Sequence, residues 1–128
     1  MIPLFRAWDK TRERHYMVHT LEFDIHGNMM GGCMHEWGDN IELTFTAEDV
    51  VIEQFTGVID KKGRKIFNGD IVMCNNKHVG VVEWEEHDCC FNVSGYYNPS
   101  NDYPTIAFME GQPFEVVGNI HDNLDLLP

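Results

Sequence analysis

Acidic, imidazole and thiol groups gather in one short stretch, and this is where chemistry is most concentrated. The acidic run over 83–88 contains Glu83, Glu85, Glu86, His87 and Asp88, and Cys89 and Cys90 follow it directly. Carboxylates beside an imidazole bind divalent metal ions or act as acid–base pairs, so this stretch supports the hypothesis of a metal-dependent hydrolase. Such charges also occupy solvated hairpin turns, where they keep an edge strand from aggregating. We favour this second interpretation and assign no catalytic residue.

A second group of metal-binding side chains lies in the glycine-rich stretch 26–40. His26, Cys33 and His35 fall within ten positions, with three methionines between them. Imidazole and thiolate suit zinc, and thioether with thiolate suits copper(I). A structural zinc site normally needs four ligands at a recognised spacing, such as paired Cys-x-x-Cys motifs, and the stretch has none. We therefore expect no bound metal and no other cofactor.

Basic residues are clustered although the chain is acidic. Eight of the nine positive charges fall in two groups: Arg6, Lys10, Arg12 and Arg14, and Lys61, Lys62, Arg64 and Lys65. If the two hairpins that carry them lie side by side, they form a positive patch for a nucleic-acid backbone or an acidic partner. Two solvated hairpin tips are the simpler interpretation. A third is that the tips meet acidic faces of neighbouring copies of the chain.

The candidate binding residues come from these two groups and from one tryptophan beside them. They are Arg6, Trp8, Lys61, Lys62, Arg64 and Lys65. Trp8 and Trp84 sit in strand patterns, which is typical of tryptophans in a core or an interface. The chain carries no glycine-rich phosphate loop and no zinc-protease motif.

Charge and composition exclude several classes of protein. The 128 residues are 43% hydrophobic and 23% charged, which is ordinary for one globular unit and excludes general disorder. The formal net charge of −12 argues against non-specific binding to nucleic acid or to an anionic membrane. No apolar run is long enough to span a membrane, and the first ten residues lack a secretory core. We expect a cytoplasmic protein with free thiols.

The elements that must position these residues are mainly short strands separated by turn signals. Their spacing is typical of a β-sandwich or barrel, and no helix long enough for a parallel crossover is indicated. We predict a hairpin over 3–23 and strands at 41–45, 50–55, 70–74, 79–84, 89–93 and 114–117. The stretch 26–40 has four glycines and no periodicity and predicts a loop, as does 95–104.

Turn chemistry marks the joints between these strands. The charged segment 60–65 with Gly63 predicts a hairpin tip, and Asn68-Gly69 predicts a tight turn that Asp70 closes by bonding backbone amides. Thr46 and Asn123 are candidate caps of single helical turns.

Several sequence blocks, in order along nearly the whole chain, resemble the YopX-like proteins of bacteriophages and prophages. They are FRAWD at 5–9, QFTG at 54–57, DKKG at 60–63, IFNGDIV at 66–72, GVVEW at 80–84, FEVVGNI at 114–120 and the tail 123–127. The resemblance implies a mostly β protein with an SH3-like barrel in its C-terminal part. It implies no established reaction and no catalytic residues.

The sequence thus predicts an all-β chain with an N-terminal β segment and glycine-rich loop at 1–53 and an SH3-like barrel at 54–128. We expect a non-enzymatic phage or prophage accessory protein that acts by protein binding or self-assembly in the host cytoplasm. Its expected partners are copies of itself and host or phage proteins. The hydrolase using 83–90, and a binder of nucleic acid or of a host nucleic-acid-binding protein, remain the alternatives.

Overall fold

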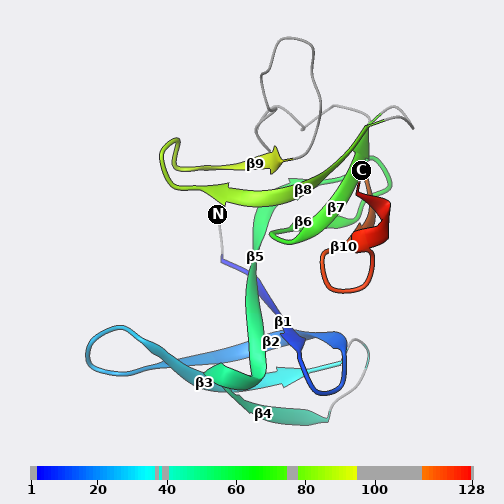
Figure 1. Cartoon of the computed structure of the whole chain (residues 1–128). Helices are drawn as coiled ribbons and strands as arrows, with labels where there is room; N and C mark the ends of the chain where they lie inside the picture. The colour runs from blue at the N-terminus through cyan, green and yellow to red at the C-terminus, as the bar shows by residue number, and fades with distance from the viewer. Residues whose placement is uncertain (1–2, 37, 39–40, 75–77, 95–113, 128) are drawn as a thin grey trace. The chain divides into compact units, whose positions relative to one another are not determined.

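The chain folds into antiparallel β-sheet throughout (Figure 1). The structure, a computed structural model, describes residues 3–36, 38, 41–74, 78–94 and 114–127. Helical structure in this part of the chain is limited to two three-residue 3-10 turns. None of its helices is long and apolar enough to cross a membrane. The contacts divide the chain into two compact units, an N-terminal unit Ile2–Gln54 and a C-terminal unit Phe55–Pro128.

The N-terminal unit is a sheet with strand order β4-β3-β2-β1-β5. Its elements are β1 (Phe5–Asp9), β2 (Arg14–Phe23), β3 (Met29–His35), β4 (Glu42–Thr46), the turn η1 (Ala47–Asp49) and the first half of β5 (Val50–Ile59). The predicted hairpin over 3–23 is confirmed, with Ala7 opposite Tyr16. Side chains alternate between faces along a strand, so one face collects the apolar cluster Ala7, Tyr16, Met34, Phe45 and Val50.

Strand β3 corrects the prediction of a loop over 26–40. Met29–His35 pairs with both β2 and β4. Gly31 and Gly32 hide the strand pattern, yet both are buried and packed against neighbouring backbone. A Cβ on Gly31 would meet the carbonyl oxygen of Phe45, and a Cβ on Gly32 would meet that of Thr20. These two glycines therefore allow neighbouring strands to approach closely and do not form a turn.

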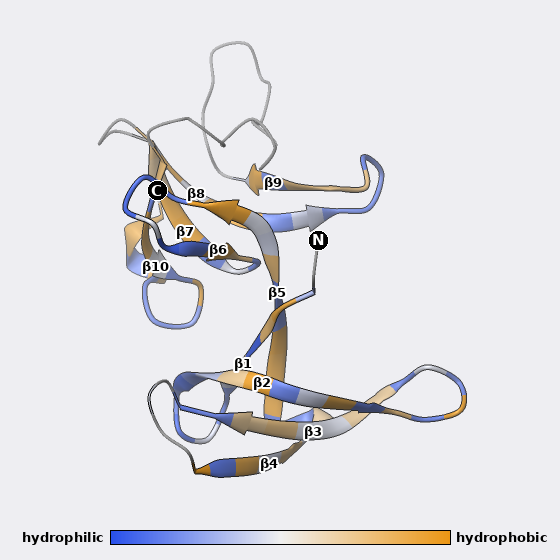
Figure 2. Cartoon of the chain, turned by 180° about the vertical axis from the view of Figure 1, so that it is seen from behind, coloured by the Kyte–Doolittle hydropathy of each residue, from blue (hydrophilic) through white to orange (hydrophobic). Residues whose placement is uncertain are grey.

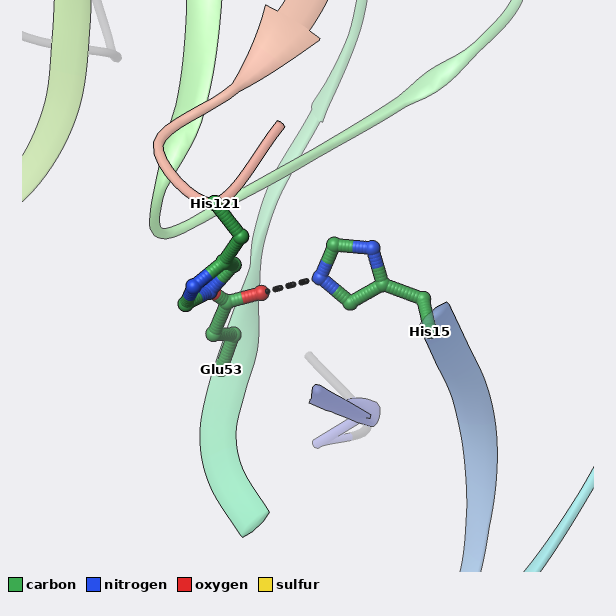
Figure 3. A group of neighbouring side chains, drawn as sticks. All are labelled: His15, Glu53 and His121. Atoms are coloured by element: carbon green, nitrogen blue, oxygen red, sulfur yellow. Dashed lines mark hydrogen bonds and ion pairs between the residues drawn. The ribbon is translucent and has the colours of Figure 1, made fainter. Parts of the chain in front are cut away.

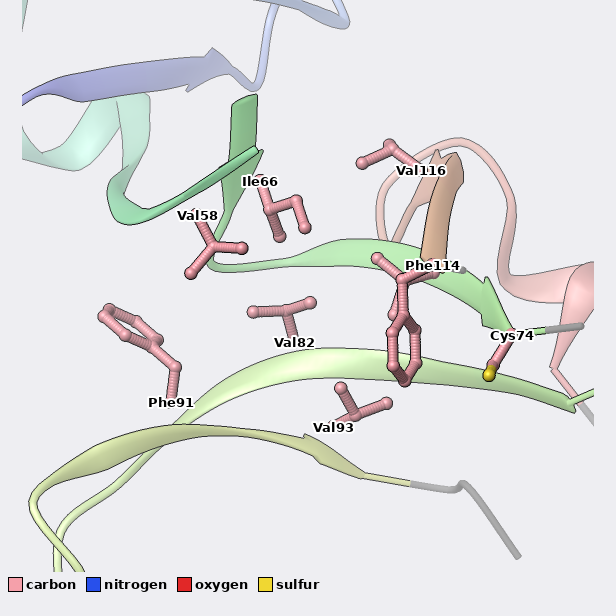
Figure 4. Packing of buried hydrophobic residues seen from close by; sticks show 9 residues of the cluster. Val58, Ile66, Cys74, Val82, Phe91, Val93, Phe114 and Val116 are labelled. Atoms are coloured by element: carbon pink, nitrogen blue, oxygen red, sulfur yellow. The ribbon is translucent and has the colours of Figure 1, made fainter. Parts of the chain in front are cut away.

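The C-terminal unit contains a four-stranded sheet of order β10-β7-β8-β9. Its elements are the second half of β5, β6 (Lys65–Phe67), β7 (Asp70–Cys74), β8 (His78–Glu85), β9 (Cys90–Ser94), β10 (Phe114–Asn119) and the turn η2 (Leu124–Leu126). Strand β6 pairs with β5. Figure 4 shows the core, which consists of Val58, Ile66, Val72, Cys74, Val82, Phe91, Val93, Phe114 and Val116.

The tight turn before β7 has the predicted chemistry. Gly69 adopts a φ of 88°, in the left-handed region that favours glycine. The Oδ2 of Asp70 accepts the Phe67 backbone N–H at 2.8 Å, and the Gly69 N–H donates to the Val82 carbonyl at 2.8 Å. The prediction that Asp70 closes this turn is confirmed, and the turn ties β6 and β7 to β8.

Both predicted helical turns are present, without the predicted cap bonds. Thr46 and Asn123 occupy the N-cap positions of η1 and η2, but neither side chain bonds the helical backbone. The Thr46 hydroxyl donates to the Asp49 carboxylate, and the Asn123 side-chain oxygen accepts the Asn119 N–H. The Asn123 side chain therefore fixes the end of β10.

A closed SH3-like barrel is not found among the described residues. Strands β10 and β9 stand at opposite ends of the four-stranded sheet, and their described residues do not pair with each other. Closure of a barrel requires such pairing between edge strands. The stretch 95–113, which includes the predicted loop at 95–104, lies outside the described residues.

Candidate functional site

A buried carboxylate organises the face of the N-terminal unit that carries Arg6 and Trp8. The register of β1 and β5 sets Arg6 opposite Glu53, and the Arg6 Nε lies 2.8 Å from Glu53 Oε1. His15 Nε2 lies at the same distance from that oxygen (Figure 3). The Glu53 side chain is only 3% exposed and that of Arg6 13%. Burial of a carboxylate is costly without such partners, so the Arg6 guanidinium stabilises the buried Glu53 side chain.

Trp8, the aromatic member of the predicted binding set, is buried. Its relative exposure is 7%, and its ring packs edge-on against His15 with 4.9 Å between centroids. The prediction that Trp8 belongs to a core or interface agrees with this burial. A side chain this enclosed offers little surface for stacking in the folded chain.

The other four predicted binding residues meet at the turn between β5 and β6. Asp60, at its start, accepts the backbone N–H groups of Lys62, Arg64 and Val116 at 2.8–3.0 Å. Burial alone would raise the pKa of Asp60, but these donors and the Arg64 charge hold it below its ordinary value. Asp60 thus joins the basic turn to β10.

The lysines of this turn face an acidic neighbour on β10. Lys62 Nζ lies 2.8 Å from Glu115 and Lys61 Nζ 3.7 Å from it. The Lys62 ammonium hydrogen-bonds Glu115, which lowers the pKa of Glu115 and raises that of Lys62. Arg64 donates to the Val116 carbonyl, and Lys65 is exposed on β6. The positive charge of the turn is therefore partly neutralised within its own unit.

The N-terminal basic group is also engaged locally. Arg12 Nη1 lies 2.6 Å from Asp9, and Arg14 Nη1 lies 3.0 Å from Glu36. Lys10 Nζ donates to the Glu48 carbonyl at 3.0 Å. The two basic groups belong to different units, and each group has acidic partners within its own unit.

The acidic stretch 83–90 forms the β8–β9 hairpin end. The Glu85 carboxylate accepts the His87 backbone N–H, and the Cys89 thiol contacts the Glu86 carbonyl. Burial, then the charges of Asp88 and Glu85, raises the pKa of the Cys90 thiol, which makes it a poorer nucleophile at neutral pH. Among the described residues, no three ligand atoms from this stretch converge within bonding reach of one ion.

The candidate metal ligands of the glycine-rich stretch 26–40 do not form a three-ligand group either, among the residues that the structure describes. His26 lies in the β2–β3 turn, whereas Cys33 and His35 are two positions apart on β3. The His35 ring packs against His19 with 3.9 Å between centroids. This aromatic contact accounts for the position of His35.

Exposed apolar side chains are the surface feature that the sequence patterns missed. Trp84 is 49% exposed and packs edge-on against Phe91, so of the two predicted positions, core or interface, the core is excluded for this side chain. Phe23, Ile25 and Met30, at the end of the β2–β3 hairpin, are 59%, 95% and 57% exposed. Phe23 and Ile25 alternate with the charged residues Glu22 and Asp24 in the sequence. Because 26–40 was predicted to be a loop, the β2–β3 hairpin that carries Phe23 and Ile25 was not predicted.

Comparisons with known proteins place this architecture in a family. No curated protein matches the chain. Protein EF1440 from Enterococcus faecalis is 24% identical, with 100% of this chain and 99% of that chain covered and a TM-score of 0.65. The yopX protein from Bacillus subtilis is 18% identical, with 98% and 95% covered and a TM-score of 0.61. These identities support a shared fold alone. The family model described as YopX protein matches residues 4–128, and the chain therefore belongs to the YopX family.

Proposed function

We propose that this YopX-family protein is a non-enzymatic accessory protein of a bacteriophage or prophage that acts by binding proteins, including copies of itself, in the host cytoplasm. The observation that carries the proposal is the exposure of large apolar side chains on ordered hairpins, at Phe23, Ile25, Met30 and Trp84. Exposed apolar groups gathered on a surface mark contact sites for other proteins more often than catalytic sites.

The state of the charged groups also supports protein binding over the alternatives. Lys62, Arg12 and Arg6 have carboxylate partners within their own units, which reduces the positive charge offered to a phosphate backbone. Where the structure describes 83–90, those side chains serve the turn and do not form a metal-ligand set. The exposed apolar side chains are therefore the feature that best supports a function, and that function is protein binding.

We also propose that Phe55–Pro128 is an SH3-like unit in a partly open form. The support is its set of short antiparallel strands around a single apolar core. Such small β units present hairpins and loops from a rigid scaffold, which suits a protein that works by contact.

The direct test is affinity capture of a tagged chain from a bacterial host with an induced prophage, followed by mass spectrometry. Light scattering of the purified chain gives its assembly state. We expect specific host or phage proteins at near-stoichiometric amounts, or a mass that is a multiple of 14.8 kDa. A monomer across a wide concentration range that also captures nothing beyond an untagged control would contradict the proposal.

A further inference from the structure

The end of the β2–β3 hairpin presents apolar side chains on a rigid support. Phe23 pairs with Met29 across the hairpin, and Ile25 lies in the turn that connects the strands. Figure 2 shows a short hydrophobic segment at the outer end of this hairpin, between hydrophilic segments. Ile25, at 95% exposed, is almost fully presented to solvent. We call the side chains of Phe23, Ile25 and Met30 the hairpin knob.

Hydrogen bonds fix the turn that carries the knob. Asp24 Oδ1 accepts the backbone N–H groups of His26 and Asn28 at 2.8 and 2.9 Å. The Asn28 donors, backbone and side chain, hold the pKa of Asp24 below its ordinary value. Gly27 has a φ of 84°, which completes the turn. A preorganised knob loses little conformational entropy on binding, which favours recognition.

The knob is continuous with the apolar face of its own unit and with a hollow beside it. Leu21 and Met29 pack against the N-terminal core, and Phe23 is paired with Met29 on the neighbouring strand. A hollow of about 400 Å³ is lined by Met29, Met30, Thr46, Ala47 and Glu48. A partner side chain can therefore enter the hollow while the knob packs on the partner.

Charge around the knob has one sign. No Lys or Arg occurs anywhere between residues 15 and 60. Glu22 and Asp24 flank Phe23 in the sequence, and Glu48 lines the hollow. A second copy docked through the same face would bring carboxylates against carboxylates, which costs free energy. A complementary partner has basic side chains around an apolar centre.

We propose that the hairpin knob and its hollow dock a protein whose contact surface combines apolar side chains with Lys or Arg. This inference rests on the proposed function, since it names the surface and the chemistry of a partner. The apolar contacts supply the affinity, and the carboxylates select a basic partner and speed its approach.

The test uses the full chain and a fluorescent probe, a short synthetic peptide of alternating Leu and Lys, with binding followed by anisotropy. Two further probes separate the contributions, one with Ser in place of Leu and one with Glu in place of Lys. We expect the Leu/Lys peptide to bind and both others to bind at least about tenfold more weakly. The double variant Phe23→Ser/Ile25→Ser should lose affinity for the Leu/Lys peptide by a similar factor.

The matched control is Ile59→Ser, which changes a 55% exposed apolar side chain of the C-terminal unit. It should bind the Leu/Lys peptide like the unaltered chain, and unchanged circular dichroism should show that all variants fold. Equal binding of the Leu/Lys peptide by the knob variant and the unaltered chain would overturn the site, as would absence of binding to the unaltered chain.

Equal binding of the Ser/Lys or Leu/Glu peptide by the unaltered chain would overturn the stated partner chemistry. A dimer that the knob variant abolishes would identify a second copy as the occupant instead. The capture experiment is independent, so captured partners alongside a failed peptide test would refute this site and leave the proposed function standing.

Discussion

At the scale of single residues, four acidic side chains in the described part of the chain are buried. Asp9, Glu53, Asp60 and Asp70 are each at most 7% exposed. Three of them accept backbone N–H groups at turns, whereas Glu53 has the Arg6 and His15 side chains as partners. Since buried charges are costly without such partners, these hydrogen bonds and ion pairs are needed to keep the acids buried in the folded chain.

Asp60 provides a test at this scale, because its Oδ2 accepts the Val116 N–H. Asp60→Asn can place an amide NH₂ against that donor, and we expect a loss of about 1–3 kcal/mol in the free energy of unfolding near neutral pH. The folded pKa of Asp60 is lowered, so its contribution is present above the unfolded pKa of about 4 and is lost as the pH falls through the folded value.

Urea unfolding at a series of pH values measures this effect. The difference in unfolding free energy between the unaltered chain and Asp60→Asn should shrink as the pH falls from about 4 through the lower folded pKa of Asp60, below which both side chains are neutral. Asp125→Asn is the control, because Asp125 is exposed in the same unit and should unfold like the unaltered chain at every pH. A difference between Asp60→Asn and the unaltered chain that does not change with pH would contradict the assignment.

Gly69 provides a second test, at the turn between β6 and β7. Its φ of 88° is costly for a β-branched residue, so Gly69→Val should reduce the free energy of unfolding by about 1–3 kcal/mol. Thermal unfolding followed by circular dichroism gives the change. A melting temperature equal to that of the unaltered chain would show that the turn tolerates a side chain and is not fixed as described.

At the scale of elements, β3 shows how glycine can form a strand. Its pairing with β2 and β4 places Gly31 and Gly32 between two neighbouring backbones, where side chains have no room. The strand has Met34, one of the largest fully buried side chains, three positions after Gly31. The N-terminal sheet therefore depends on β3 for both its core and its close strand contacts.

Substitution of Gly32 tests the close contact. Gly32→Ala would set a Cβ against the Thr20 carbonyl, and we expect it to cost about 1–3 kcal/mol because the strands must shift. Amide chemical shifts should change on both β2 and β4. Gly27→Ala is the contrast: its added Cβ meets nothing within 4 Å, so its cost comes from the backbone alone and its shifts should stay near the hairpin turn. Identical shift patterns for the two variants would refute the close contact.

At the scale of the whole molecule, charge is distributed unevenly. The net charge is −12, and every Lys and Arg precedes residue 78. The basic groups that do occur have carboxylates beside them, as Lys62 has Glu115. Long-range fields around the protein are therefore negative, which steers anionic partners away and basic partners toward it.

This distribution predicts that the chain does not bind duplex DNA at physiological salt, where non-specific binding depends on phosphate neutralisation. Fluorescence anisotropy with a labelled duplex at about 0.15 M NaCl measures it. Glu115→Gln, which removes the carboxylate beside Lys61 and Lys62, is the informative variant and should raise any residual affinity more than Asp125→Asn does. Tight, salt-sensitive binding by the unaltered chain would favour a nucleic-acid role.

Local structure could be predicted from the sequence wherever one signal dominated. Alternating apolar residues marked most of the strands, and Asn68-Gly69-Asp70 specified its turn, because backbone sterics and short-range hydrogen bonds depend on neighbours in the chain. The resemblance carried by the blocks from 5 to 127 was confirmed by the family match over 4–128.

Only the tertiary structure decided what long-range pairing controls. Gly31 and Gly32 are strand residues because β2 and β4 approach them, a contact that no local pattern encodes. Trp8 is buried and Trp84 exposed although both sit in strand patterns, since alternation predicts two faces but not which one is covered. The ion-pair partners of the basic residues were likewise hidden in the sequence. Glu53 lies beside Arg6 and Glu115 beside Lys62 only in the folded chain, because these partners are far apart in the sequence.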